Sequence, residues 1–595
     1  MQRVLLILFG AAFTAACCWA SGALLLRRLR LPLAPVEQFL FSFLCGAPCV
    51  SSLVCILCVV HAVYPVLILC IGAGLILWAG LDRVRTSPAK PFPTISKQWK
   101  LALFAIFTCL FIIYFFNALA PEVSPDGAGY HLGNVARDLR NHGFLWNYRS
   151  MYSAFPQGME MLFLVAFTFG EHSSAALVHF AFFAALPVLI LCYGRRFRVF
   201  RPAAFAAILL VASPLFGVVG TSAYNDVTLV TCIYAVFYLL EVSDEFKNIN
   251  ILIIIGLLCG FCFALKYTGG LALVFALLRC TRGPDNRARI RQMVAVLAPA
   301  ALVASPWLLR NWFWLGNPLA PFFNRWFPNP YFSLSSEKDY LSSLAQFGSL
   351  RHWWEFPLEV TIYGGKIPGF LGPVFLLAPL ALLSLRYPLG RRLLAAAALF
   401  SLPMFFNSDT RFLMPAVPFL AVALGIAVAN SPGALPALAL FQTVACLPAV
   451  TPLYSAPWSW RIREVPVRAA LRLEPESAYI GRHFSDYKLK AAIEISIPNS
   501  QSIFSFRTRP ESYFNRTIVV GYESAVGQEI QRILLNAAEH PELRRQTAAD
   551  LKRRGIGFLL VSPTDPAADQ FTHHLNSWGM ISLKEVDETS LYQIE

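Results

Sequence analysis

Six ionisable residues of this sequence stand at the ends of long apolar runs, and their side chains suit proton transfer and phosphate binding. They are the carboxylates Asp126, Asp226 and Asp409 and the cations Lys266, Arg310 and Arg411. An aspartate has an ordinary pKa of about 3.9, so it is ionised at neutral pH and can accept a proton from a hydroxyl or an amine. Lysine and arginine stabilise the negative charge of a phosphate, and arginine can do so through two parallel hydrogen bonds.

Each of the six residues also has a structural interpretation. The three aspartates stand close to where helices are expected to begin, and an aspartate can cap a helix. Pro125 and Gly127 on either side of Asp126 indicate a turn. The three cations could extend their charged ends to the membrane interface while their stems stay among apolar groups. A shared functional site is favoured only if all six lie on one side of the membrane, where such costly charges could act together.

The chain as a whole has the composition of a membrane protein. Hydrophobic residues make up 57% of its 595 residues and charged residues only 14%, whereas a soluble domain carries about 25% charged residues. A helix needs about 17–25 apolar residues to span a bilayer. About fourteen such helices are predicted, near residues 5–26, 37–60, 64–82, 100–119, 174–194, 202–220, 226–241, 250–266, 268–281, 291–309, 368–385, 392–406, 410–429 and 434–452.

Clusters of basic residues orient these predicted helices. If Arg27 to Arg30 lie in the cytoplasm, the N-terminus is external and every later cluster is also cytoplasmic, as the positive-inside rule expects. The net charge of +15 is therefore explained by basic clusters on the cytoplasmic side of the membrane. Nucleic acid is excluded as a partner because no basic stripe lies on a soluble segment. The later clusters are Arg83, Arg85 and Lys90; Arg195, Arg196 and Arg198; Arg279, Arg282, Arg287, Arg289 and Arg291; and Arg386, Arg391 and Arg392.

On this topology the six ionisable residues all fall near the external ends of spans, and the C-terminus is external. Met159–Phe169 is apolar but too short to span, so we expect a helix that lies at the external interface. The chain then divides into N-terminal helices with a cytoplasmic linker (1–99), a transmembrane core (100–452) with external loops 120–173 and 311–367, and an external soluble domain (453–595).

The external tail has the pattern of a small α/β domain, in which short β-like runs alternate with helical stretches. It contains no Gly-rich phosphate loop. All 14 cysteines lie at or before Cys446, so no disulfide can stabilise the tail. The predicted strands are Ser502–Phe506, Thr517–Val520, Gly557–Val561, Ile581–Val586 and Leu591–Ile594, and the predicted helices lie around 525–538 and 541–554.

The motifs around the six residues resemble those of GT-C-type membrane glycosyltransferases, and most of all the aminoarabinose transferase and protein O-mannosyltransferase group. The resemblance covers residues from about 100 to 450, and the first three spans and the tail lie outside it. Its first element is the loop with Pro125-Asp126, Tyr130-His131-Leu132, Ala136-Arg137, His142-Gly143, Ser153, Phe155-Pro156-Gln157 and Glu160-Met161-Leu162. The others are Ala223-Tyr224-Asn225-Asp226, Leu265-Lys266-Tyr267-Thr268-Gly269, Pro306-Trp307-Leu308-Leu309-Arg310-Asn311 with Gly316-Asn317-Pro318, and Asp409-Thr410-Arg411-Phe412 with Pro415 and Pro418.

The resemblance implies a GT-C-like polytopic helical protein that transfers a sugar from a polyprenyl-phosphate-linked donor, with inversion of the anomeric centre. The acceptor would be a glycan, a lipid or a protein at the outer face of a cell membrane, here the bacterial inner membrane. Asp126 takes the role of general base. The expected substrate-binding residues are Tyr130, His131, Tyr224, Asp226, Lys266, Arg310 and Arg411.

This sequence departs from the group at two positions of the first loop. Relatives often carry a second acidic residue directly after the aspartate, where this chain has Gly127, and they can present a lysine at Phe155-Pro156, where it has none. No cofactor follows from the sequence, and a divalent metal stays an open alternative.

Three other functions fit a polytopic protein of this kind. A transporter or lipid flippase for envelope precursors would show internal symmetry and broken helices at mid-depth. A polysaccharide polymerase or ligase would present Arg- and His-rich loops, and a non-catalytic scaffold would use its tail to bind a partner. The large external loops and the lack of an evident repeat favour glycosyl transfer.

Overall fold

A computed structural model describes residues 2–82, 96–146, 149–246, 248–281, 285–346, 350–431, 433–587 and 589–595. Arg83, Arg85, Lys90 and Arg282 of the basic clusters lie outside the described residues. The chain forms two compact units. Unit 1 comprises Met1–Ala120, Pro156–Pro306 and Ser343–Ala470, and unit 2 comprises Pro121–Phe155, Trp307–Ser342 and Leu471–Glu595.

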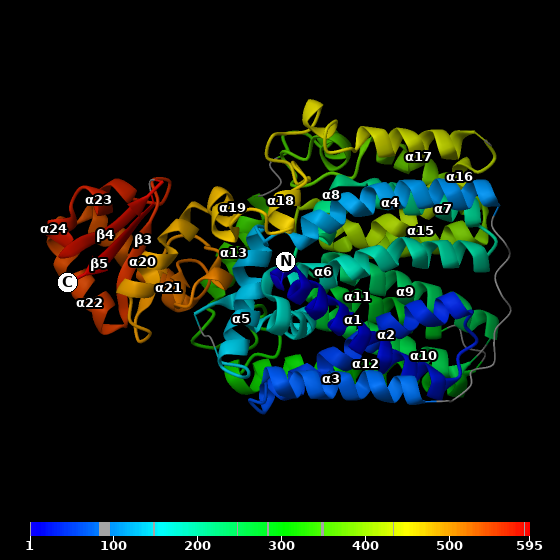
Figure 1. Cartoon of the computed structure of the whole chain (residues 1–595), viewed down its shortest axis with the longest axis horizontal. Helices are drawn as coiled ribbons and strands as arrows, with labels where there is room; N and C mark the ends of the chain where they lie inside the picture. Colours follow the sequence, from blue (N-terminus) through cyan, green and yellow to red (C-terminus); the bar gives the residue numbers. More distant parts are fainter. Residues whose placement is uncertain are drawn as a thin grey trace. The chain divides into compact units, whose positions relative to one another are not determined.

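Unit 1 is a bundle in which the long helices lie side by side along a common direction (Figure 1). Its helices are α1 (Gln2–Leu29), α2 (Pro35–Val59), α3 (Pro65–Leu81), α4 (Lys97–Leu119), α6 (Gly158–Arg196), α7 (Phe200–Ala212), α8 (Pro214–Gly220), α9 (Asp226–Phe246), α10 (Ile249–Leu265), η3 (Tyr267–Gly270), α11 (Leu271–Cys280), α12 (Asn286–Leu315, which continues into unit 2), α14 (Glu355–Leu358), η4 (Glu359–Tyr363), η5 (Pro373–Arg386), α15 (Pro388–Phe400), η6 (Leu402–Phe405), η7 (Thr410–Ala416), α16 (Val417–Val428), α17 (Ala434–Ala445), η8 (Thr451–Leu453) and α18 (Val467–Ala470).

Among the described residues, seven helices are long and apolar enough to cross a membrane, and the count is eight if the bent pair α7 and α8 forms one span. Pro214 opens α8 and has no N–H to donate, which accounts for the break in this pair. Five further apolar helices are shorter. Each of the fourteen predicted spans coincides with helical residues, and the predicted class, a polytopic α-helical membrane protein with a small C-terminal sheet, is confirmed. The number of helices that cross the bilayer stays a prediction.

The segment Met159–Phe169 is helical as predicted, but its predicted surface position is wrong. It forms the first part of α6, which is interrupted at Glu171 by a residue with φ 54° and ψ −145°. Its side chains are almost all buried. The Ser51 hydroxyl of α2 donates to the Gly158 carbonyl at 2.8 Å, and a Cβ at Gly170 would lie 2.6 Å from the Ile7 Cα of α1. Apart from Glu160, which is also buried, apolar residues occupy every side of this segment, and a helix of this kind is enclosed by protein instead of lying in an interface.

Unit 2 combines two loop regions of the chain with the C-terminal tail. Its helices are η1 (Gly127–His131), α5 (Leu132–Arg140), η2 (Met151–Ala154), α13 (Leu334–Gln346), α19 (Glu476–His483), η9 (Ser485–Leu489), α20 (Lys490–Ser496), η10 (Glu511–Tyr513), α21 (Ala525–Glu539), η11 (Pro541–Leu543), α22 (Arg544–Arg553), α23 (Ala568–Thr572) and α24 (Leu575–Trp578). Its strands are β1 (Ser502–Ser505), β2 (Ile518–Val520), β3 (Ile556–Val561), β4 (Met580–Val586) and β5 (Thr589–Ile594).

The five strands form one mixed sheet in the order β2-β1-β3-β5-β4. Strand β1 is parallel to both β2 and β3, and β5 is antiparallel to β3 and β4. Every residue of β3 is buried, because one face of the sheet packs on residues of α21 and α22 and the other on residues of α20. The five predicted strands and the two predicted helices of the tail are therefore confirmed.

Candidate functional site

Unit 1 brings two of the predicted residues together at neighbouring helix ends. Asp226 is the first residue of α9, and Lys266 follows the last residue of α10 in an extended conformation. Their side chains form an ion pair, with 2.8 Å between the Lys266 Nζ and the Asp226 Oδ1. The Asn225 amide donates to the Leu265 carbonyl at 2.7 Å, which fixes the two helix ends relative to each other. Asp226 is buried, whereas the lysine side chain keeps 26% of its surface exposed.

A second ion pair forms at the start of η7. Asp409 caps this helix, because its Oδ1 accepts the Arg411 backbone N–H at 2.8 Å, and its Oδ2 accepts the Arg411 Nε–H at 3.0 Å. The guanidinium of Arg411 lies 4.3 Å from the ring centroid of Trp460 and 5.4 Å from that of Tyr224. A cation over an aromatic face is stabilised by about 0.5–2 kcal/mol. The capping interpretation of Asp409 is thus correct, and the cap also orients Arg411.

The two ion pairs adjoin and form one cluster. Lys266 Nζ lies 4.4 Å from the ring centroid of Phe412, the residue after Arg411. Burial raises the pKa of Asp409, and the nearby Asp226 carboxylate raises it further, while Arg411 lowers it. We call Asp226, Lys266, Asp409 and Arg411 the charged cluster. Its two cations are held by carboxylates among aromatic rings, an arrangement that suits an incoming anion such as a phosphate.

Unit 1 also contains a hollow with an apolar wall and a single cation. Apolar residues of α4 and of the segment after α17 supply most of the wall. The Arg461 Nε is buried and makes no hydrogen bond within the described part of the chain. The hollow thus combines apolar side chains with one partly buried guanidinium. The lining residues are Leu110, Ile113, Tyr114, Pro214, Cys446, Pro448, Thr451, Arg461 and Ile462.

In unit 2, Asp126 stands directly before the short π-helix η1. Its side chain makes no capping hydrogen bond to η1, so the capping interpretation does not hold for this aspartate. Gly129 departs from helical geometry with φ −74° and ψ −111°. The Tyr130 ring stacks on that of Tyr152, with 4.2 Å between centroids and 8° between planes, and His131 is buried with its ring 4.2 Å from Tyr130. The first loop therefore presents a carboxylate beside a stack of aromatic rings.

The glycine that replaces an acidic residue after Asp126 has a steric explanation. A Cβ at Gly127 would lie 3.0 Å from the carboxyl carbon of Glu122 and would also collide with the Ser124 hydroxyl. Glu122 is buried, and its Oε1 accepts the Ser124 N–H at 2.7 Å. A second carboxylate therefore does lie beside the Asp126 turn, but it comes from four residues earlier in the sequence.

Arg310 holds the end of the first loop in place. Its guanidinium donates to the carbonyls of Ser153 and Phe155 at 3.0 and 2.9 Å. It also lies 5.0 Å from the ring centroid of Trp307. The next residue, Asn311, donates to the Ala154 carbonyl at 2.7 Å. These contacts give Arg310 a positioning role, and its contact with a donor phosphate stays a prediction.

The predicted site residues thus fall into two groups. Unit 1 holds Tyr224, Asp226, Lys266 and Arg411, and unit 2 holds Asp126, Tyr130, His131 and Arg310. The sequence did not identify Trp460, Glu122 or Tyr152. Trp460 and Tyr152 contact residues that are distant in the sequence, Arg411 and Tyr130. Glu122 is brought beside Gly127 by the turn before η1. In the ranges that the structure describes, no group of three or more His, Cys, Asp or Glu side chains is arranged to hold a metal ion.

Comparisons with known proteins bear on the same segments. Residues 159–314 match the sequence model of the family described as dolichyl-phosphate-mannose-protein mannosyltransferase. The matched range runs from α6 to α12 and includes Asp226, Lys266 and Arg310, and the predicted resemblance to GT-C glycosyltransferases is confirmed. None of the curated proteins matches the sequence.

Several solved structures are similar to this chain. ArnT from Cupriavidus metallidurans, solved with undecaprenyl phosphate, has a TM-score of 0.47 and 14% identity over 84% of this chain and 99% of its own. The mycobacterial arabinofuranosyltransferase AftD has a TM-score of 0.49 and 14% identity over 84% of this chain and 40% of its own. The Archaeoglobus fulgidus oligosaccharyltransferase, solved with a tethered acceptor peptide, has a TM-score of 0.40 and 12% identity over 77% and 69%.

Proposed function

We propose that this chain, whose residues 159–314 match a family of lipid-phosphate-dependent mannosyltransferases, transfers a sugar from a polyprenyl-phosphate carrier to an acceptor. The reaction takes place at the outer face of a cell membrane, which we propose is the bacterial inner membrane. The single observation that carries the proposal is the charged cluster: the ion pairs of Lys266 and of Arg411 adjoin, and Lys266 lies within the matched segment.

The charged cluster is proposed to bind the phosphate of the donor. Lys266 is partly exposed and the Arg411 guanidinium lies over the Trp460 ring, so we propose that both offer N–H groups to an anion. Asp226 and Asp409 hold these cations in place before the donor binds. A preorganised cation stabilises charge that develops on a leaving group without further rearrangement.

The chemical step is a single displacement at the anomeric carbon. The acceptor hydroxyl or amine loses its proton to Asp126 as its oxygen or nitrogen bonds to the anomeric carbon. The bond from that carbon to the phosphate oxygen breaks, and the electron pair leaves with the polyprenyl phosphate. One displacement inverts the anomeric centre. Tyr130 and His131 contribute the ring surface beside Asp126, and a positioned base of this kind contributes about 10²–10⁴ in rate.

Reconstitution tests this proposal directly. The purified full-length protein is placed in liposomes with an undecaprenyl-phosphate-linked radiolabelled sugar and an extract of cell-envelope glycans, glycolipids and proteins. We expect label to pass to the acceptor fraction while undecaprenyl phosphate is released in equal amount. If the labelled lipid only moves between leaflets and its sugar–phosphate bond stays intact, the protein is a flippase and the proposal is wrong.

A further inference from the structure

The tail of the chain contacts the turn that carries Asp126, the proposed base. The contacts come from η10, a short helix of the tail. The Ser512 hydroxyl donates to the Ala128 carbonyl at 2.6 Å, and the Tyr513 hydroxyl donates to the Glu122 carbonyl at 2.8 Å. All of these residues belong to unit 2. The two hydrogen bonds therefore hold the backbone on both sides of Asp126, before it at Glu122 and after it at Ala128.

The turn itself has little that would fix its conformation. Asp126 is followed by Gly127, Ala128 and Gly129, and glycine loses more conformational freedom on folding than any other residue. The turn leads into the π-helix η1, which is a rare form of helix, and Gly129 departs from helical geometry within it. Contacts from elsewhere in the fold are therefore needed to hold this turn in one conformation.

Small residues of the first loop allow η10 to pack closely against it. Ala128 is fully buried, in a cluster with Tyr513 and with Ile480 of α19. A Cβ at Gly133, in the first turn of α5, would lie only 3.3 Å from the Glu511 Cβ. A larger side chain at either position would push the tail away from the first loop. The sequence of the loop thus permits the close approach that the two hydrogen bonds require.

The tail holds the first loop at a second place, next to the aromatic stack. The Ser150 hydroxyl donates to the Glu523 Oε2 at 2.5 Å, and the Met151 N–H donates to the Glu523 carbonyl at 2.9 Å. Only 2% of Glu523 is exposed. The next residue of the loop is Tyr152, on which the Tyr130 ring stacks. The tail therefore contacts both segments of the first loop that meet in this stack.

We infer that the tail positions the base, with Ser512 and Tyr513 as positioning residues, an inference that rests on the proposed function. A general base must lie within hydrogen-bond reach of the proton that it accepts, and a misplacement of about 1 Å can lower a rate by about 100-fold. Loss of either hydroxyl frees the backbone beside Asp126. The two residues act through Asp126 and need no contact with donor or acceptor.

Two substitutions that each remove only a hydroxyl group test this inference in the full-length protein. Ser512→Ala and Tyr513→Phe are placed in liposomes with an undecaprenyl-phosphate-linked sugar and the acceptor extract. We expect kcat to fall by about 10-fold in each variant, and further in the double variant. KM for the donor should stay unchanged, because the charged cluster belongs to unit 1. Hydrogen–deuterium exchange at residues 124–132 should be faster in both variants than in the wild-type protein.

The matched controls remove hydroxyl groups that form hydrogen bonds within the tail. Ser577→Ala removes a hydroxyl that donates to the His574 carbonyl at 2.7 Å. Tyr592→Phe removes the hydroxyl of a buried tyrosine of β5, which hydrogen-bonds Ser590. Both controls should keep the wild-type kcat and the wild-type exchange at residues 124–132. A general loss of stability in the tail would affect the controls and the test variants alike.

The outcomes separate this inference from the proposed function. An unchanged kcat in both test variants overturns the positioning role, and so does a fall in kcat that the controls share. Unchanged exchange at residues 124–132, or a higher KM for the donor in place of a lower kcat, also overturns it. In all of these cases the wild-type protein still transfers sugar, and the proposed function stands.

A different result would identify a failure of the proposed function. If the wild-type protein releases no polyprenyl phosphate from the donor, the proposed function fails, and the positioning of a base fails with it. Faster exchange at residues 124–132 in Ser512→Ala and Tyr513→Phe would then show that the tail orders this turn without a role in sugar transfer.

Discussion

The Lys266 ammonium lies 2.8 Å from the Asp226 carboxylate, although 40 residues separate them in the sequence. The pair joins the end of α10 to the start of α9, two consecutive antiparallel helices. Burying a carboxylate costs desolvation free energy even when a cation pairs with it, so such a pair is a candidate for a functional role. The role proposed above for this pair is to bind the phosphate of the donor.

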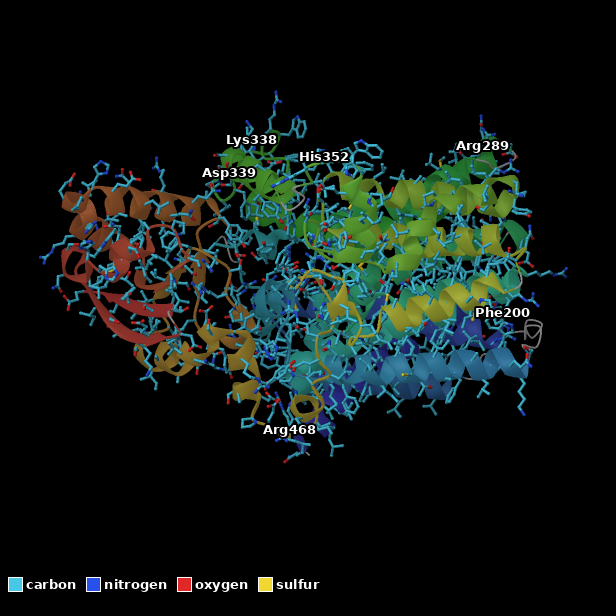
Figure 2. The ribbon with its side chains drawn as sticks, turned by 90° about the horizontal axis from the view of Figure 1, so that it is seen from above. Phe200, Arg289, Lys338, Asp339, His352 and Arg468 are labelled. Atoms are coloured by element: carbon cyan, nitrogen blue, oxygen red, sulfur yellow. The ribbon has the colours of Figure 1, made fainter. Side chains whose placement is uncertain are left out.

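Replacing Lys266 is expected to weaken use of the donor. Lys266→Ala removes one cation from the leaving phosphate, and loss of one such stabilising group costs about 100-fold in rate. The measurement is kcat/KM for an undecaprenyl-phosphate-linked sugar in liposomes. Lys338→Ala, which removes an exposed lysine of α13 (Figure 2), serves as the control and should retain full activity. Equal activity of the two variants would rule out the phosphate role of Lys266.

The stacking of Arg411 on Trp460 gives a second prediction. Trp460→Leu removes the ring that holds the guanidinium at 4.3 Å, and a contact of this kind contributes about 0.5–2 kcal/mol. We expect KM for the donor to rise by about 2- to 30-fold, and Trp460→Phe to restore most of the affinity. Normal donor kinetics in Trp460→Leu would show that the Trp460 ring does not position Arg411 for the phosphate.

Arg310 should matter first for the order of the first loop. Arg310→Ala removes the donors to Ser153 and Phe155, and lost hydrogen bonds to a charged group cost about 1.5–3 kcal/mol each. In Arg310→Ala, hydrogen–deuterium exchange at residues 150–156 should be faster than in the wild-type protein. Arg325→Ala, which removes an exposed arginine of the same 307–342 segment, is the comparison. Unaltered exchange together with a higher KM for the donor would favour the original phosphate role of Arg310.

Glu511 of unit 2, which is partly buried, predicts a pH dependence of stability. Burial raises the pKa of Glu511 from 4.5 to about 7, against a lowering effect of Arg137. The folded protein then holds the proton more tightly than the unfolded chain, so stability is greatest below pH 4.5 and is lost as pH rises through 7. The thermal midpoint of the full-length protein should fall by about 5 °C between pH 5 and pH 8. Glu511→Gln should reduce this slope; a variant with the same slope would contradict the assignment.

The pattern of apolar residues along the sequence predicts the bundle helices and the strands of the tail, but it does not predict α13, α19 or α20. The alternating apolar residues of the tail predict all five strands, and the long apolar runs predict the helices of the bundle. The segment Met159–Phe169 shows the limit of this reasoning. Its length excludes a complete span, but the sequence does not reveal that α1 and α2 enclose it, since the close contacts at Gly158 and Gly170 involve residues more than 100 positions away.

The candidate site was predictable in part for a similar reason. Charged residues at the ends of apolar runs identify Asp226, Lys266 and Arg411, because such charges are costly in any membrane protein. Trp460 and Glu523 carry no such signal. Trp460 is one of 13 tryptophans in the sequence, and Glu523 is one of many carboxylates in a polar tail; only tertiary contacts distinguish them.

The most direct measurement is single-turnover sugar transfer by Asp126→Asn in liposomes that contain an undecaprenyl-phosphate-linked sugar. The asparagine has the shape of the aspartate but cannot accept the acceptor's proton at neutral pH. We expect this variant to bind the lipid donor with unchanged affinity and to transfer sugar at least 100-fold more slowly than the unchanged protein. Transfer by Asp126→Asn at the unchanged rate would contradict the proposed mechanism.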